Sequence, residues 1–481
     1  MHLSGSNNVT RRQYLNGLGI GGLGLGGIAL SSILNPAQLA ATEIPKKIPK
    51  TKNVILLFMM GGASHLETFD FKPQLKRHSG KLARDLFTDD ELKGFNPEKD
   101  FSKSRMLTPV FPFQRHGQSG QWVSEIFPEV AKVIDEITII KSMHAGSPIH
   151  SVGQLLMHTG FNRPGFPSMG SWVNYGIGSE NKDMPGFVAL VDGRSDNSSG
   201  GTAMYHSGFL PGEYQATVVE TSKNYQPPIP YLQSSIRLNQ QQQNKELQLI
   251  NQLNQIHQEK NKSQPELNAR IAAFEKAFKM QAQAPQLFDI RRESEATRKL
   301  YGESTFGESC LRARRLVEQG VRFVEVFDGT SGRRWDAHGN RGGLIQNHKS
   351  NAARTDKAIA GLILDLKSRG LLDETLVVWG TEFGRTPFEE ERATQGKLGR
   401  GHHHYGFSMW MAGGGTKGGT SYGETDEFGM HAIQDRVSHY DLHATILHLL
   451  GIDHKELTYK HNGRQFRLTD VEGRVINEII A

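Results

Sequence analysis

Side chains that can bind a metal ion recur in five short segments of this sequence. Three consecutive histidines, His402, His403 and His404, stand directly before the apolar run FSMWMAGGG. The other segments are GGASHLETFD with His65, HAGSPIHSVGQLLMHTG with His144 and His150, WDAHGN with Asp336 and His338, and TEFGRTP with Glu382 and Arg385. Carboxylate oxygens combined with imidazole nitrogens suit zinc, manganese, iron or nickel, and a pair of such ions can hold an oxyanion ester during displacement. The pattern predicts a metal or oxyanion site, against the alternative of scattered surface polar groups.

Each of these segments adjoins an apolar run of the kind that forms a buried strand. The first run, residues 54–60 in KNVILLFMMGG, is continuously apolar and ends in two glycines, as strands buried on both faces do. The others are EITIIKSM, GFVALV, VRFVEVF, TLVVWG and FSMWMAGG. In α/β sheets, ligands bind beyond the carboxyl ends of the strands. We therefore expect the five segments to meet at one edge of a sheet.

Helical patterns alternate with these strands. In TDKAIAGLILDLKSRG, the residues Ile359, Leu362 and Leu366 share one face, and Gly370 ends the pattern. In SHYDLHATILHLLG, Ser438 is placed to cap the first turn. Alternation of this kind predicts an α/β fold with a mostly parallel central sheet flanked by helices.

The overall composition narrows the class of protein. The chain has 481 residues, 37% of them apolar, and a formal net charge of +6. We find no long basic stripe with interleaved aromatic residues, which argues against a nucleic-acid partner. Cys310 is the single cysteine, so no disulfide can form within the chain. It lies in GESCLRARRLVEQG, which predicts an amphipathic helix with a buried structural thiol.

The N-terminal region has the features of an export signal. Arg11 and Arg12 precede a glycine-rich apolar stretch, and small residues surround Ala41. The stretch at residues 1–41 therefore resembles a bacterial twin-arginine signal, which predicts a periplasmic or extracellular location. Its many glycines make it a poor membrane anchor, so no stable span is expected after its removal. Residues 42–481 then form one domain, in which the Gln-rich residues 232–300 are a helical insertion.

The longer motifs resemble the DUF1501 family, a sulfatase-like family of the alkaline phosphatase superfamily. The similar stretches are GGASHLETFDFKP, PSMGSWVNYGIGSEN, ARRLVEQGVRFVEV, WDAHGN, LLDETLVVWGTEFGRTP, HHHYGFSMWMAGGGTKGG and DLHATILHLLGID. The resemblance covers the whole chain. It implies an alkaline phosphatase/sulfatase-like fold with one or two divalent metal ions, of the zinc, manganese or calcium type, at the strand ends.

The resemblance also implies roles for individual residues. His150 falls at the position of the nucleophile, although Ser147, Ser151 and a metal-bound water stay open as alternatives. The metal ligands expected on this basis are Asp336, His338, Glu382, His402, His403 and His65. The sequence departs from the superfamily pattern at Glu382-Phe383, where an Asp-His pair is usual, and at Glu67 and Gly401, where the family often has aspartate. No cysteine stands in a C-x-P-S-R context, so formylglycine chemistry of the cysteine type is excluded.

Two functions follow as hypotheses. The first is an exported, metal-dependent hydrolase of sulfate or phosphate esters, acting on a small molecule or on a polysaccharide. The second is a non-catalytic protein of the same fold that binds a glycan or a partner protein. In the first case, the Arg385 guanidinium would hold two oxygens of the ester. Within the histidine run, neighbouring side chains of an extended segment point to opposite sides. We therefore expect one histidine to bind metal, one to orient a neighbour and one to face solvent.

Overall fold

The computed structural model describes most of the chain after residue 49. The described residues are 50–94, 101, 103–181, 183–192, 199–221, 242, 245, 248, 249, 252, 286–329, 335–339, 343–390 and 397–481. The expected signal at residues 1–41 lies outside them, as does most of the expected insertion at residues 232–300. Among the described residues, no helix has both the length and the apolar character needed to cross a membrane.

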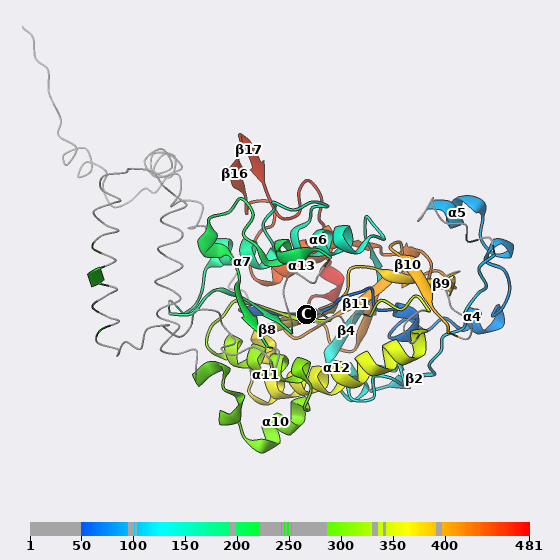
Figure 1. Ribbon diagram of the computed structural model, residues 1–481, viewed down its shortest axis with the longest axis horizontal. Helices are drawn as coiled ribbons and strands as arrows, with labels where there is room; N and C mark the ends of the chain where they lie inside the picture. The colour runs from blue at the N-terminus through cyan, green and yellow to red at the C-terminus, as the bar shows by residue number, and fades with distance from the viewer. Residues whose placement is uncertain are drawn as a thin grey trace, which may run out of the picture. The chain divides into compact units, whose positions relative to one another are not determined.

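A nine-stranded sheet forms the centre of the described part of the chain (Figure 1). Its main path runs β12-β4-β11-β8-β1-β7-β5-β6, and β15 pairs with β4. The strands are β1 (Asn53–Met59), β4 (Ile137–His144), β5 (Phe187–Val191), β6 (Thr217–Glu220), β7 (Phe323–Asp328), β8 (Thr375–Gly380), β11 (Phe407–Ala412), β12 (Thr420–Tyr422) and β15 (Val437–Ser438). All neighbouring pairs are parallel except those that β11 makes with β4 and β8. The mostly parallel α/β sheet expected from the sequence is confirmed.

Helices cover both faces of this sheet, because its central strands are apolar on both sides. On one face lie α6 (His150–Thr159), α7 (Met169–Ile177) and α13 (His439–Leu449), and on the other lie α10 (Glu295–Tyr301), α11 (Thr305–Glu318) and α12 (Gly343–Ser368) (Figure 1). Strand β1 shows the alternation directly. Its residues Val54, Leu56 and Phe58 belong to the core under the first face, and Ile55 and Leu57 belong to the core under the second.

Smaller elements surround the sheet. The short helices are α4 (Pro73–Arg77) and α5 (Asp89–Gly94). The two-stranded pairs are β2 (Phe113–His116) with β3 (Gln121–Ser124), β9 (Gly384–Glu389) with β10 (Arg400–His403), β13 (Glu424–Thr425) with β14 (Ala432–Gln434), and β16 (Tyr459–His461) with β17 (Arg464–Phe466). The antiparallel β9-β10 pair is the one that matters for the site, because it carries both Arg385 and His402.

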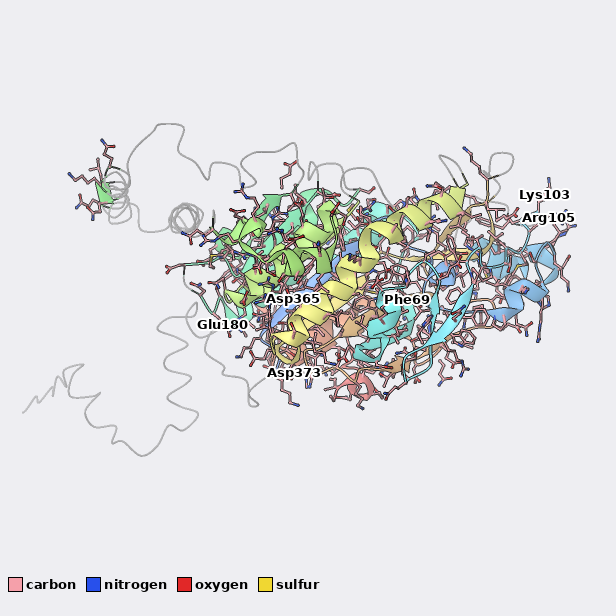
Figure 2. The ribbon with its side chains drawn as sticks, turned by 90° about the horizontal axis from the view of Figure 1, so that it is seen from below. Phe69, Lys103, Arg105, Glu180, Asp365 and Asp373 are labelled. Atoms are coloured by element: carbon pink, nitrogen blue, oxygen red, sulfur yellow. The ribbon has the colours of Figure 1, made fainter. Side chains whose placement is uncertain are left out.

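The expected helix ends agree with the structure in α13, and α12 is longer than expected. The Ser438 side chain accepts a hydrogen bond from Asp441 N, and the Asp441 carboxylate accepts one from Ser438 N, which completes a capping box. Helix α12 begins at Gly343, well before the apolar pattern of residues 355–370. It runs along one face of the molecule, where Asp365 is labelled in Figure 2. Asp365 accepts from Tyr301 Oη at 2.8 Å and pairs with Arg314 at 2.9 Å, which ties α12 to α10 and α11.

Candidate metal centre

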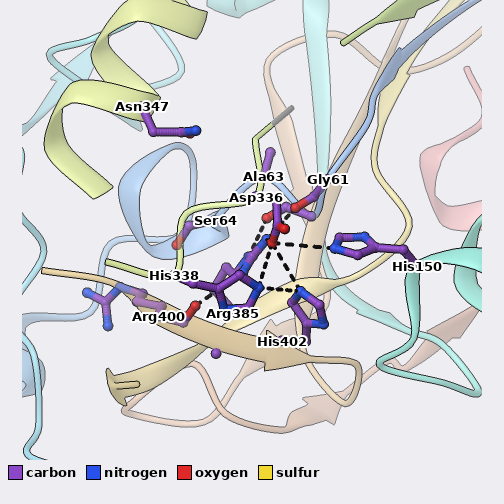
Figure 3. A network of polar contacts seen from close by, with 12 residues as sticks. Gly61, Ala63, Ser64, His150, Asp336, His338, Asn347, Arg385, Arg400 and His402 are labelled. Carbon is purple, nitrogen blue, oxygen red and sulfur yellow. Dashed lines mark hydrogen bonds and ion pairs between the residues drawn. The ribbon is translucent and has the colours of Figure 1, made fainter. Parts of the chain in front are cut away.

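Four side chains bring metal-binding atoms together at one edge of the sheet. They are His150, Asp336, His338 and His402, and one ligand atom from each lies within 4.8 Å of those of the others. His150 is the first residue of α6, Asp336 and His338 follow β7, and His402 lies in β10 (Figure 3). Among the described residues, these four side chains form the group whose ligand atoms could hold a metal ion.

The topology of the sheet explains why these segments meet. Strands β4, β7 and β8 run in the same direction, so the segments that follow them emerge at the same edge. Strand β11 runs in the opposite direction, and its beginning therefore lies where the others end. The histidine run precedes β11 in the sequence. Antiparallel β11 thus delivers His402 to the edge that carries His150 and Asp336.

Each histidine of the cluster is held by an acceptor behind its ring. The three Nδ1 contacts are His150 with Glu382 Oε1 at 2.7 Å, His338 with Glu390, and His402 with the carbonyl oxygen of Pro148 at 2.8 Å. These contacts place the proton on Nδ1 and turn Nε2 toward the centre of the group. Histidines that bind metals are usually oriented in this way, by a carboxylate or a backbone carbonyl on the other ring nitrogen.

The contact between His402 and Asp336 suits a bound cation. Because Pro148 O can only accept, His402 Nδ1 carries the proton, and burial lowers the pKa of His402 to about 3, so its Nε2 is an unprotonated acceptor. Burial alone would raise the pKa of the Asp336 carboxyl, but the Arg385 charge and the neighbouring histidines outweigh it and hold that pKa far below its ordinary value. The two acceptor atoms lie 3.1 Å apart. A positive charge between them would turn this repulsion into attraction.

The donor set and its exposure indicate the kind of ion. Three imidazoles and one carboxylate suit zinc, manganese or another transition metal, whereas calcium takes oxygen ligands. The side chains are 16% exposed for His150 and His338, 22% for His402 and 30% for Asp336. Structural zinc sites are closed, while catalytic ones keep a position open to water or substrate. Solvent reaches this cluster, so it fits the second kind of site.

Arg385 contacts Asp336 from the interior of the protein and does not face solvent. Its side chain is fully buried, and Nη2 donates to Asp336 Oδ1 at 2.7 Å. The remaining bonds go to backbone carbonyls: Nε donates to Gly62 O at 2.7 Å, Nη1 to Arg400 O at 3.1 Å, and Nη2 also to Gly61 O. This differs from the expectation that its guanidinium holds the ester oxygens. The physical reason is that two carbonyls of the turn after β1, the carbonyl of Arg400 and the Asp336 carboxylate take up its donors.

Glu382 also lies behind the cluster, contrary to the expectation that it binds the metal directly. It is fully buried at the end of β8. Its carboxylate accepts the backbone N–H of Gly61 at 2.9 Å, the side-chain amide of Gln154 at 3.1 Å, and Nδ1 of His150. Burial would raise the pKa of Glu382, but its bond to His150 outweighs this and lowers it. Glu382 therefore stays ionised and orients His150.

Three of the expected histidine positions are buried away from the cluster. His65 donates from Nε2 to Gly429 O at 2.8 Å, and His403 donates from Nε2 to Met430 O. His403 lies on the opposite side of β10 from His402, as the alternation of a strand requires. The expectation that one histidine of the run faces solvent is wrong, because His403 is fully buried and His404 is 6% exposed.

Two groups that orient histidines of the cluster were not predicted from the sequence. Glu390 is the second of several consecutive acidic residues, a pattern that usually marks a solvated surface, yet it is 2% exposed and holds His338. The acceptor for His402 is a main-chain carbonyl, at Pro148, which carries no side-chain signal. Glu390 directly follows β9, whose last residue Glu389 is opposite Arg400.

Replacing Glu390 with glutamine is expected to weaken metal binding by about 10–100-fold, the usual effect of losing an outer partner of a metal-binding histidine. The amide keeps a similar shape but removes the negative charge that holds the His338 proton on Nδ1. Competition with a zinc chelator measures the affinity. The matched control is Glu389→Gln on the neighbouring residue, which should bind zinc like the wild type. Equal affinities for both variants would show that Glu390 does not support the ion.

A glycine next to the cluster sets the distance between two of its segments. A Cβ added at Gly399 would come under 3.0 Å from His338 and Gly339 backbone atoms, so the two segments would have to separate. Gly399→Ala is therefore expected to cost metal affinity, by about 10-fold or more, as loss of correct ligand placement does. Gly401→Ala is the control, since its Cβ would meet Thr386 at an ordinary 3.4 Å. Isothermal titration with zinc compares them, and matching affinities would contradict this account.

Comparison with known proteins places the chain in a family. A family model described as "Protein of unknown function (DUF1501)" matches residues 51–480. The chain belongs to the DUF1501 family. A comparison with curated proteins gives no match.

Several solved structures are similar to this member of the DUF1501 family over most of its length. The lipoteichoic acid synthase LtaP from Listeria monocytogenes has a TM-score of 0.37 and 10% identity, over 90% of this chain and 80% of that chain. The PsFucS1 sulfatase from Pseudoalteromonas sp. has a TM-score of 0.35 and 13% identity, over 92% and 77%. Alkaline phosphatase from the Antarctic bacterium TAB5 has a TM-score of 0.33 and 12% identity, over 84% and 99%.

Proposed function

We propose that this DUF1501 protein is a metal-dependent hydrolase of sulfate or phosphate esters. The observation that carries the proposal is the partly exposed cluster of His150, Asp336, His338 and His402, with every histidine oriented from behind. A divalent ion at such a centre polarises an ester oxygen and lowers the pKa of a bound water. The choice of ester rests on the resemblance of the sequence motifs to sulfatase-like proteins.

The distances within the cluster support different roles for its members. Asp336 Oδ1 lies 2.7 Å from His338 Nε2 and 3.1 Å from His402 Nε2, but 3.4 Å from His150 Nε2. Catalytic zinc sites usually have three protein ligands and one open position. We therefore propose that Asp336, His338 and His402 bind the ion, and that His150 stands beside it.

The placement of His150 suits proton transfer or nucleophilic attack at the open coordination position of the ion. The ring is fixed through Nδ1 by the buried Glu382 carboxylate, and its Nε2 faces Asp336 Oδ1 at 3.4 Å. An imidazole held by a carboxylate in this way can take or return a proton at Nε2, as in hydrolases that pair a histidine with an acid. It can equally attack an ester directly. Both roles need the same placement of Nε2 toward the reacting group.

Turnover of simple esters tests the proposed function. The protein is stripped with a chelator, reloaded with zinc or manganese, and assayed with aryl sulfate and aryl phosphate esters. We expect turnover of at least one ester class that disappears on stripping and returns on reloading. His150→Gln should retain the ion and lose turnover by about 100-fold or more, since general acid-base catalysis contributes about 10²–10⁴-fold. A fully loaded protein that hydrolyses neither class would contradict the proposal.

A second candidate is a non-catalytic protein that binds a glycan through the same metal centre. It is favoured by one observation: among the described residues, the cluster consists of three histidines and one aspartate and includes no cysteine thiol. Ser147, one alternative nucleophile, accepts a hydrogen bond from Ile149 N instead. Metal-dependent retention on immobilised sulfated polysaccharide, without release of sulfate, would support this second function over hydrolysis.

We also propose that the protein leaves the cytoplasm through the twin-arginine pathway. The support is the Arg11-Arg12 pair before a glycine-rich apolar stretch, and this pathway carries folded proteins with metal already inserted. Changing both arginines to lysine is expected to leave the protein in the cytoplasm. Fractionation of cells followed by immunodetection measures its location. Normal delivery of the double variant to the periplasm would refute the proposal.

A further inference from the structure

The surroundings of Asp336 limit the number of metal ions that the cluster can bind. In two-metal hydrolytic sites, the ions lie about 3.5–4 Å apart and hold the attacking and leaving oxygens together. A second ion here would have to lie beside the first and have ligands of its own.

The carboxylates next to the cluster are already used. Glu382 accepts from Gly61 N, His150 Nδ1, Gln154 Nε2 and Thr381 Oγ1. Glu390 holds Nδ1 of His338. Each of these acids therefore fixes a histidine of the cluster, and turning either one toward a second ion would release that histidine.

The place beside Asp336 is filled by a side chain. Three carbonyl oxygens, from Gly61, Gly62 and Arg400, converge with Asp336 Oδ1 around the buried Arg385 guanidinium. An all-oxygen cage of this kind is what a hard cation would choose. The cage is also rigid: Gly61 and Gly62 have φ values of 113° and 72°, and a Cβ at Gly62 would lie 2.6 Å from the Phe383 ring.

The guanidinium suits this place better than an ion that exchanges with solvent. It carries a fixed positive charge and distributes its donors in a planar fork, and four of its bonds reach the four oxygens of the cage. Its side chain is fully buried, so the charge is poorly screened by water and acts on Asp336 at short range.

We propose that the centre is mononuclear and that Arg385 is its permanent second cation. This inference rests on the proposed metal-dependent function and adds the number of ions to it. Asp336 would then bind the ion while its charge is also paired with the Arg385 guanidinium. Arg385 acts as a positioning residue, because it shapes the field at the centre without touching the ester.

The test counts the ions that depend on Asp336. The full-length protein and Asp336→Ala are equilibrated with zinc, desalted and measured by native mass spectrometry and by elemental analysis. The difference between the two proteins excludes zinc bound elsewhere. We expect a difference of one ion per chain. A difference of two would overturn the mononuclear inference and leave the metal-dependent function standing, whereas a difference of zero would remove the metal centre and the inference with it.

Two variants test whether Arg385 is what excludes the second ion. Arg385→Lys keeps the charge and should stay at one ion per chain. Arg385→Gln removes the charge and leaves the oxygen cage open, so in excess manganese it should take up a second ion. If the glutamine variant is folded by circular dichroism and still binds one ion, Arg385 does not act as the second cation. If it does not fold, the wild-type count and the lysine variant decide.

Discussion

Replacing Arg400 with methionine is expected to lower the free energy of unfolding by about 3–5 kcal/mol, the usual cost of removing one partner of a buried ion pair. Arg400 and Glu67 are both fully buried, and the guanidinium contacts the carboxylate at 2.9 Å and 3.1 Å. Arg400 also donates to the carbonyls of Leu107, Thr108 and Thr386. The methionine would leave the Glu67 charge and these carbonyls without their donor.

Urea unfolding monitored by circular dichroism measures this effect. Lys299→Met is the control, because Lys299 pairs with Glu295 on an exposed helix surface, where such pairs contribute about 0.3–0.5 kcal/mol. The double variant Glu67→Met with Arg400→Met should recover much of the lost stability, since it removes the unpaired charge as well. A single variant as stable as the control would show that the pair does not hold this part of the fold together.

The three histidines of the run are expected to respond unequally to alanine. His402→Ala removes a proposed ligand, so zinc affinity should fall by more than about 100-fold, beyond the loss that follows from an outer partner. His403→Ala should retain the ion, because this side chain contacts Met430 O on the other side of β10. It should instead destabilise the fold by about 1–3 kcal/mol, the cost of leaving a buried acceptor unpaired. His404→Ala should also retain the ion.

Chelator competition and urea unfolding, carried out on the same three variants, separate the two kinds of effect. His403→Ala controls for any general damage to β10, since the two positions are adjacent in one strand. Equal zinc affinity in all three variants would remove His402 from the centre. Loss of zinc in His403→Ala alone would mean that the register of β10 differs from the one described.

The sequence was most informative where a residue type is tied to a repeating pattern. The apolar runs of β1, β7 and β8 predicted buried strands because both faces of each strand are covered by helices. Strand β11 looked like the others, and the pattern could not show that it runs antiparallel. Direction depends on how the chain returns to the sheet, and a short apolar run carries no information about that.

The site could be predicted only in part for a similar reason. Asp336 and His338 were recognisable because they follow an apolar run, and His402 because it belongs to a histidine run that precedes one. His150 was placed by the resemblance to sulfatases. The side chains that support these residues could not be distinguished from metal ligands by residue type alone. Glu382 and Arg385 have the chemistry of ligands and of anion binders, but the carbonyls and N–H groups of the β1 turn engage both. Backbone partners of this kind become visible only in three dimensions.

We expect imidazole and carboxylate groups at the edge of the sheet to bind one divalent cation. X-ray absorption spectroscopy of the zinc-loaded protein tests it most directly, because it reports the atoms around the ion itself. The structure predicts nitrogen and oxygen neighbours at about 2.0–2.2 Å, with outer scattering from at least two imidazole rings that weakens in His402→Ala. A protein that retains no zinc, or a spectrum with oxygen neighbours and no imidazole scattering, would contradict it.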